Sequence, residues 1–245
     1  MAHRFVASPN HGERHKAIDT LILHYTGMAT GQAALERLCD PAAEVSCHYL
    51  VWENGAIDQL VLETRRAWHA GKSSWAGHHD LNSASIGIEI VNIGHTEVNG
   101  QTLPPPPYPA DQISAVIALC QDIATRHTIP KRNVLAHSDI APGRKVDPGE
   151  HFPWPSLAAQ GVGHWVQPAP LVDGVAMSTG TLGPPVMALQ HLLHSYGYGV
   201  EVNGLYDAKL EATVAAFQRH FRPARVDGVA DRSTLETLRA LIAGL

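Results

Sequence analysis

Two histidines and an aspartate are the residues of this sequence best suited to hold a metal ion. His24 ends the apolar run LILH, and His137 ends a second strand-like run, VLAH. Asp147 follows ten residues after His137 on a segment rich in proline and glycine, which disfavours a helix and restricts the path of the chain. Two histidines and a carboxylate, with one position left open, are the usual ligands of a catalytic zinc ion. Spacing alone leaves other histidines among the sixteen as competitors.

A carboxylate also stands inside an otherwise apolar predicted strand, SIGIEIVN (85–92). Strand alternation places Glu89 on the face opposite Ile86, Ile88 and Ile90. Such a carboxylate is costly to bury without a partner. Two interpretations stay open: a solvated face of an edge strand, or a general base in a cleft with its pKa raised by desolvation. A metal ion nearby would favour the second interpretation.

Three further residues have both a functional and an ordinary interpretation. Lys145 is a surface lysine by default, but beside a metal-bound Asp147 its ammonium group could stabilise an oxyanion. Arg144 is either solvated or a contact for an acidic group of a substrate. His69, in AWHAGKSSW, could line a ligand-binding pocket, or it could be a packed histidine with its ring bonded to the backbone; the sequence favours neither interpretation.

An α/β domain with a central mixed sheet flanked by helices is predicted to position these residues. Residues 1–160 form this domain. Asn54-Gly55 lies between two strand-like runs and predicts a hairpin over 45–63. The run of four prolines predicts an irregular loop over 99–109. The other expected elements are strands over 17–26, 85–92 and 133–139, and helices over 30–40 and 111–127.

The rest of the chain is expected to be a linker, 161–183, and a small three-helix domain, 184–245. Apolar residues at helical spacing define the helices, and Asp207 and Asp231 stand where N-caps are wanted. About 60 residues is near the lower limit for independent folding.

Composition narrows the classes of function. A net charge of −5 gives no basic surface for nucleic acid, and no apolar run approaches the length of a membrane span. No signal-peptide pattern opens the sequence, which favours the cytoplasm; the periplasm or cell envelope is the alternative if a leader was removed. Three cysteines do not make a disulfide framework. Buried free thiols are favoured over a Cys39–Cys47 bridge.

Five segments together resemble the zinc-dependent N-acetylmuramoyl-L-alanine amidases that share their fold with peptidoglycan recognition proteins. They span most of the first domain: LILHYTGM (21–28), VSCHYLVWENG (45–55), AWHAGKSSWAG (67–77), LNSASIGIEIVN (81–92) and AHSDIAPGRKVDPG (136–149). Two stretches of the tail, 189–207 and 213–231, resemble the small helical peptidoglycan-binding domain of cell-wall enzymes.

The resemblance implies one zinc ion per chain on His24, His137 and Asp147, a catalytic carboxylate at Glu89 and an assisting cation at Lys145. The implied reaction is hydrolysis of the amide between N-acetylmuramic or anhydromuramic acid and L-alanine, in peptidoglycan turnover or recycling. We further expect four residues to contact the substrate: Trp68, His69, Asn92 and Arg144. Two alternatives remain at this point: a peptidoglycan-binding protein without turnover, and a zinc peptidase that cuts within the stem peptide. Oligomeric state is not predicted.

Overall fold

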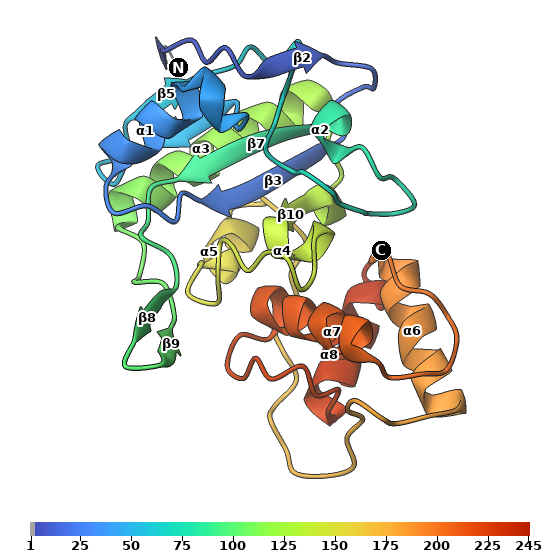
Figure 1. Ribbon diagram of the computed structural model, residues 1–245. Helices are drawn as coiled ribbons and strands as arrows, with labels where there is room; N and C mark the ends of the chain where they lie inside the picture. Colours follow the sequence, from blue (N-terminus) through green and yellow to red (C-terminus); the bar gives the residue numbers. More distant parts are fainter. Residues whose placement is uncertain (1–2) are drawn as a thin grey trace.

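A six-stranded mixed sheet forms the centre of the first domain. The computed structural model describes residues 3–245 (Figure 1). β4 and β5 pair antiparallel, and the other neighbouring strands run parallel, as predicted. In spatial order the strands are β1 (Arg4–Phe5), β5 (Ile57–Gln59), β4 (Tyr49–Val51), β7 (Ser85–Ile90), β3 (Thr20–Tyr25) and β10 (Val134–Ala136).

One face of this sheet is covered by hydrophobic side chains, and the other carries the polar residues of the candidate site. Leu21 and Leu23 share one face with the isoleucines of β7, and helix α3 (Ala110–His127) packs there. His24 and Glu89 are register partners on adjacent strands, so both project from the opposite face. Because β7 lies between β4 and β3, Glu89 is not on an edge strand. The sheet therefore separates a hydrophobic layer from a layer that carries the polar residues.

Short elements and loops surround the sheet. The hairpin predicted over 45–63 is confirmed, with Gly55 at positive φ in its turn. Two small antiparallel sheets pair β2 (His11–Glu13) with β6 (Arg65–Ala67), and β8 (Thr96–Val98) with β9 (Gln101–Leu103). The remaining elements of this domain are α1 (Gly31–Cys39), η1 (Pro41–Ala43), α2 (Leu81–Ala84), η2 (Lys131–Asn133), α4 (His137–Ile140) and α5 (Trp154–Ala159).

Two local predictions were wrong. The segment 99–109 is not wholly irregular, because Asn99 and Gly100 adopt positive φ and turn the chain into strand β9; the four prolines themselves are irregular. The last strand ends at Ala136 rather than 139. The Asp139 carboxylate accepts a hydrogen bond from the Ala136 backbone N–H at 2.8 Å and starts helix α4 at His137.

The tail contains the three predicted helices, α6 (Pro184–Tyr196), α7 (Ala208–Phe221) and α8 (Arg232–Ala243). Asp207 and Asp231 are the N-caps of the second and third helices, as expected. Their carboxylates accept from the N–H groups of Leu210 at 2.9 Å and Thr234 at 2.7 Å. Local capping chemistry in the sequence thus fixed both helix starts.

The tail helices share a hydrophobic core with the first domain. Trp75 is almost fully buried, and its indole packs so closely on Gly197 that a Cβ there would lie 2.7 Å from the ring. The Ala76 N–H donates to the Gly197 carbonyl at 2.7 Å. The first domain contributes Ile22, Ala70, Trp75, Leu81, Leu135, Ile140 and Ala141 to this core. The tail is therefore anchored on the first domain through buried apolar contacts.

Two features of the composition are settled by the structure. Cys39, Cys47 and Cys120 are free thiols, and the last two are buried. Within residues 3–245, no helix combines the length and apolar character needed to cross a bilayer.

Candidate metal centre

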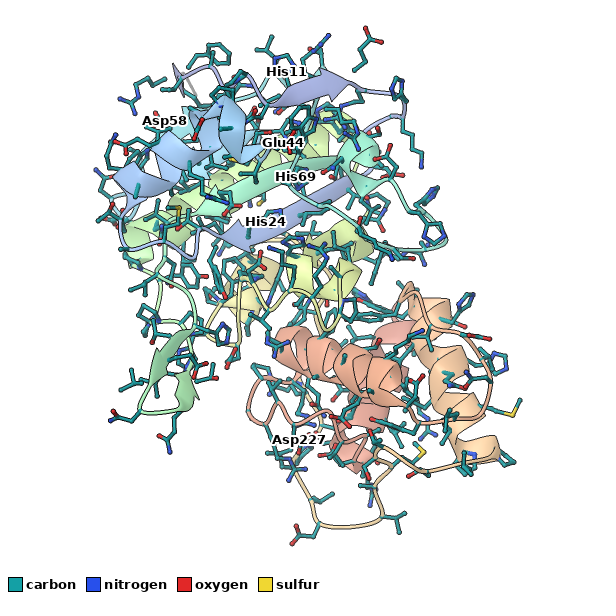
Figure 2. The ribbon with its side chains drawn as sticks, in the orientation of Figure 1. His11, His24, Glu44, Asp58, His69 and Asp227 are labelled. Atoms are coloured by element: carbon teal, nitrogen blue, oxygen red, sulfur yellow. The ribbon has the colours of Figure 1, made fainter. Side chains whose placement is uncertain are left out.

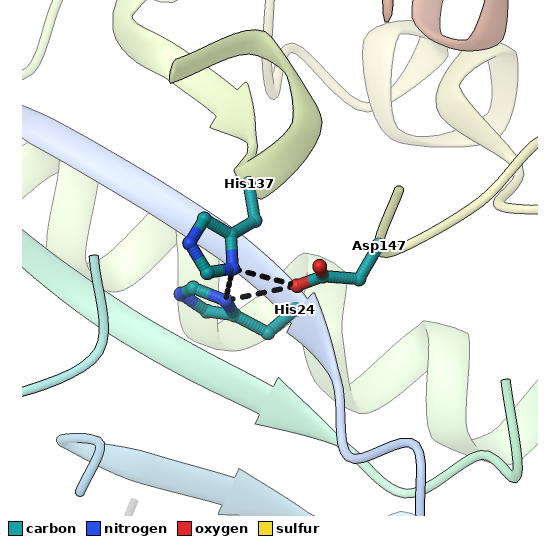
Figure 3. Close-up of side chains that lie close together, drawn as sticks. All are labelled: His24, His137 and Asp147. Atoms are coloured by element: carbon teal, nitrogen blue, oxygen red, sulfur yellow. Dashed lines mark hydrogen bonds and ion pairs between the residues drawn. The ribbon is translucent and has the colours of Figure 1, made fainter. Parts of the chain in front are cut away.

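Three ligand atoms converge at the carboxyl end of β3. The Nδ1 atoms of His24 and His137 lie 2.8 Å apart, and each is 3.0 Å from Oδ2 of Asp147 (Figure 3). All three residues are buried. The structure therefore brings together the three predicted ligands from a strand, a helix start and a loop.

The donor set fits a divalent cation. Three lone pairs at such distances repel one another unless positive charge lies between them. Burial, with His137 adding to it, lowers the pKa of His24 to about 4, so its ring is neutral at pH 7. Burial raises the pKa of Asp147, but the two histidines outweigh it and hold that pKa far below the ordinary range. Neutral imidazoles and an ionised carboxylate are the protonation states that metal binding requires.

The outer nitrogen of each histidine is also engaged. Nε2 of His137 lies 3.2 Å from the carbonyl oxygen of Ala70, to which its N–H donates. Nε2 of His24 lies 3.1 Å from Nδ1 of His69. Such outer contacts orient metal-binding rings and fix which nitrogen carries the proton.

Glu89 lies beside this centre with an unusual electrostatic environment. Among the residues that the structure describes, its Oε2 atom has no hydrogen-bond partner. Burial raises the pKa of Glu89 well above its usual value, and the Asp147 carboxylate adds to the rise, while Lys145 opposes it. Glu89 is half-buried as a residue, but its Oε2 atom is buried; a carboxyl group with such an oxygen and a raised pKa is suited to accept and return a proton.

A cavity of about 350 Å³ opens next to these groups. Lys145 is half-buried in its wall, with Glu89, His137 and Asp147. Sequence reasoning missed Arg37, an exposed residue of α1 that also lines the cavity. An arginine on a solvated helix face carries no signal that distinguishes it from its neighbours. The complete lining is Tyr25, Thr26, Gly27, Met28, Ala34, Arg37, Leu38, Val45, His69, Glu89, His137, Lys145 and Asp147.

The four predicted substrate contacts occupy different positions. His69 borders the cavity, but only 6% of its surface is exposed, and its ring contacts that of His24. The Asn92 amide donates to the Pro106 carbonyl at 3.0 Å and accepts from the Gly94 N–H at 2.9 Å. Arg144 donates to the Ala70 and Lys72 carbonyls at 2.6 and 2.8 Å. Trp68 is half-buried near Gly12.

The cavity lining does not include Trp68, Asn92 or Arg144. The side chains of Asn92 and Arg144 are instead engaged with backbone groups near the centre. Direct contact of any of the four residues with a substrate stays a prediction.

Comparison with known proteins adds independent information on both parts of the chain. Residues 14–150 match the family model described as N-acetylmuramoyl-L-alanine amidase, and residues 183–238 match a peptidoglycan binding domain model. The amidase AmiD of Escherichia coli K12 is 40% identical over 232 residues, which are 92% of this chain and 82% of AmiD. The amidase AmpD of Enterobacter cloacae is 31% identical over 62% of this chain and 86% of its own length.

Solved structures agree over nearly the whole chain. E. coli AmiD in complex with the substrate anhydro-N-acetylmuramic acid-L-Ala-D-γ-Glu-L-Lys superimposes with a TM-score of 0.80 at 37% identity, covering 96% of this chain and 98% of AmiD. AmpDH3 of Pseudomonas aeruginosa in complex with anhydromuramic pentapeptide gives a TM-score of 0.81 at 35% identity, covering 94% and 92%. Both likenesses extend across the tail helices as well as the sheet.

Proposed function

Since this chain belongs to the N-acetylmuramoyl-L-alanine amidase family, we propose that it carries one zinc ion and that its preferred substrate is an anhydromuramyl peptide. The enzyme hydrolyses the amide that joins the muramic lactyl group to L-alanine. The observation that carries the zinc proposal is the convergence of two Nδ1 atoms and one carboxylate oxygen beside an open cavity.

His24, His137 and Asp147 would hold the zinc ion. When bound, zinc would polarise the scissile carbonyl and make a water molecule more acidic. Glu89 takes a proton from the attacking water and passes it to the leaving amine of L-alanine. Lys145 lines the same cavity, and we assign its ammonium group to the negative charge that develops on the carbonyl oxygen.

The anhydro preference is supported by the relatives that match the whole chain. The AmiD complex contains an anhydromuramyl tripeptide, and the AmpDH3 complex contains an anhydromuramic pentapeptide.

The stem peptide is acidic, and the cavity presents two cationic side chains, Arg37 and Lys145. Lys145 acts electrostatically on His24 and Glu89, so we assign it to the reacting groups and Arg37 to a carboxylate of the stem peptide.

The test compares two substrates in the same protein. Purified enzyme is incubated with a muramyl peptide and with the matching anhydromuramyl peptide, before and after chelation and with zinc restored. Mass spectrometry follows the released peptide. We expect a peptide that begins with L-alanine, faster release from the anhydro substrate, loss of activity on chelation and recovery with zinc.

Each other outcome overturns part of the proposal. Equal or faster release from the muramyl peptide would remove the anhydro preference. Recovery with another divalent ion but not with zinc would remove the zinc assignment. A product cut within the stem peptide would indicate a zinc peptidase. Binding without release would indicate a peptidoglycan-binding protein.

Location in the cytoplasm is a separate proposal. Fractionation of cells expressing the full-length gene would test it. Recovery of the enzyme with the periplasm or envelope would favour the alternative.

A further inference from the structure

We propose that His69 and Ser85 are positioning residues that hold His24 in the tautomer whose Nδ1 lone pair faces the metal. The proposal rests on the role of His24 as a ligand in the proposed function. A chain of hydrogen bonds runs from the Leu81 carbonyl of α2 through Ser85 and His69 to the ring of His24. The direction of each hydrogen bond determines the direction of the next.

The first link is the Ser85 hydroxyl. Its Oγ lies 2.5 Å from the carbonyl oxygen of Leu81. A carbonyl oxygen only accepts hydrogen bonds, so the single hydroxyl hydrogen of Ser85 is donated there. The Oγ atom then has only lone pairs to offer to Nε2 of His69, which lies 3.2 Å away. That nitrogen of His69 therefore carries a hydrogen.

The second link is the His69 ring. The ring is only 6% exposed, and its two nitrogens face a serine hydroxyl and another imidazole rather than a carboxylate, so no partner is present to compensate a buried positive charge and the ring is neutral. A neutral ring with hydrogen on Nε2 has a lone pair on Nδ1. This atom lies 3.1 Å from Nε2 of His24, which must donate to it. His24 then carries its hydrogen on Nε2 and presents the Nδ1 lone pair to the metal.

The local backbone is built to keep the His69 ring in place. The Oδ1 atom of Asn82 accepts from the N–H groups of His69 at 3.0 Å and Ala70 at 2.8 Å. The ring lies against Gly87, where a Cβ would be only 2.4 Å from Cγ of His69. Figure 2 shows His24 and His69 close together in the interior of the first domain. Gly87 is thus the space that the ring needs.

The consecutive residues His69 and Ala70 accept hydrogen bonds from the Nε2 atoms of the two histidine ligands, which face away from the metal. The His69 ring accepts from His24, and the Ala70 carbonyl accepts from His137. Asn82 fixes the backbone of this pair. The same segment therefore sets the orientation of both rings, and a change in His69 acts on metal binding without contact with the metal.

The test uses two substitutions at one position. His69→Asn keeps an acceptor oxygen close to the place of Nδ1, whereas His69→Leu fills similar volume without an acceptor. Zinc dissociation constants are measured by competition with a chromophoric chelator. We expect His69→Leu to weaken zinc binding about 10- to 100-fold, and His69→Asn to recover most of the loss.

Nitrogen NMR of the metal-free proteins gives a readout that a merely structural role would not move. In the wild type, the His24 ring is expected to carry hydrogen on Nε2, and in His69→Leu to populate both tautomers. Ser85→Ala should shift the tautomer in the same direction by a smaller amount. His48→Asn serves as a control, because His48 is also buried and close to His69, but its hydrogen bonds run to Arg14, the Arg65 carbonyl and the Gly87 N–H.

Equal zinc affinity in the Asn and Leu variants, with an unchanged His24 tautomer, would overturn the inference. This failure is distinct from failure of the proposed function. A wild-type protein that binds zinc but releases no peptide would contradict the anhydromuramyl substrate proposal and leave the tautomer result standing.

Discussion

Asp139 and Asp147 are two buried carboxylates on one stretch of chain, each beside a buried histidine, and they have opposite tasks. Oδ1 of Asp139 accepts the Tyr198 hydroxyl at 2.7 Å. Its Oδ2 accepts from Nδ1 of His220 at 2.6 Å and from the Ala136 N–H at 2.8 Å. Every contact of this carboxylate is with a donor of the protein, and the ring of His220 stacks on Trp154.

Asp147 has a different environment. Its Oδ2 lies 3.0 Å from Nδ1 of both His24 and His137, and a cavity lies beside it. In the tautomers proposed above, both Nδ1 atoms present lone pairs to a metal ion. The comparison teaches that a histidine–aspartate pair alone does not identify a metal centre. The Asp139 and Asp147 clusters differ in the histidine nitrogen that faces the carboxylate. Nδ1 of His220 donates to Asp139, whereas Nδ1 of His24 and of His137 keep a lone pair beside Asp147 in the proposed tautomers.

The largest expected effect comes from replacing Asp147 of the metal centre with asparagine. Asp147→Asn removes a charged ligand, so we expect loss of stoichiometric zinc and a fall in kcat of about 1,000-fold or more. Metal analysis after dialysis and peptide release measure both. Because the two histidines hold the pKa of Asp147 low, its ionised carboxylate also stabilises the folded chain, so the metal-free variant should lose some stability as well. A variant that kept its zinc and its turnover would remove Asp147 from the centre.

Glu89→Gln should affect turnover while leaving zinc in place. Loss of a general base lowers kcat by roughly 100- to 10,000-fold. The base must be ionised, and the pKa of Glu89 is raised by burial and by Asp147, so wild-type kcat/KM should fall as pH drops through that pKa. The residual activity of the variant should lack this acid limb. An unchanged pH profile in the variant would assign the limb to another group.

Asp139→Asn should damage stability. The amide oxygen can keep the contacts to His220 and the Ala136 N–H, with the NH2 group turned to the Tyr198 hydroxyl, which must reverse from donor to acceptor. Hydrogen bonds to an ionised carboxylate thereby become neutral ones, which costs about 1–3 kcal/mol. Each kcal/mol lowers the melting temperature of a chain this size by about 2–4 °C. Calorimetry on the metal-free protein isolates this effect from metal binding. A melting temperature equal to that of the wild type would contradict a stabilising role for the Asp139 carboxylate.

Tyr198→Phe is the smallest of these changes. It removes one donor from Asp139 and leaves the aromatic ring in the shared core, at a cost of about 1 kcal/mol. Denaturant unfolding with an unchanged m-value would measure it. A loss several times larger would mean that the hydroxyl organises the interface beyond a single bond.

The sequence predicted the parts of the centre that local patterns control. Strand ends, alternation and a loop restricted by proline and glycine made His24, Glu89 and Asp147 candidates. The resemblance to the amidase family then singled them out. Local capping also gave the helix starts at Asp207 and Asp231. For the two helix starts, the information lies within a few residues of the position concerned.

The sequence did not predict features that depend on long-range packing. His69 lies 45 residues from His24 along the chain, and only the folded sheet brings their rings together. The Asp139 cluster needs residues from α4, the segment after α6, and α7, none of which is periodic with the others. The shared core was hidden because Trp75 lies on a loop, where periodicity gives no indication of its partners.

The shared core has a consequence for the covalent connection between the two parts. Residues 170–176 of that connection are exposed throughout, with Val175 at 94% exposure. A protease that cuts there would sever the chain but not the buried contacts of Trp75, Tyr198 and their neighbours. The nicked protein should migrate as one particle and unfold in a single transition. The two pieces, expressed as separate polypeptides, should associate and reconstitute an intact amidase.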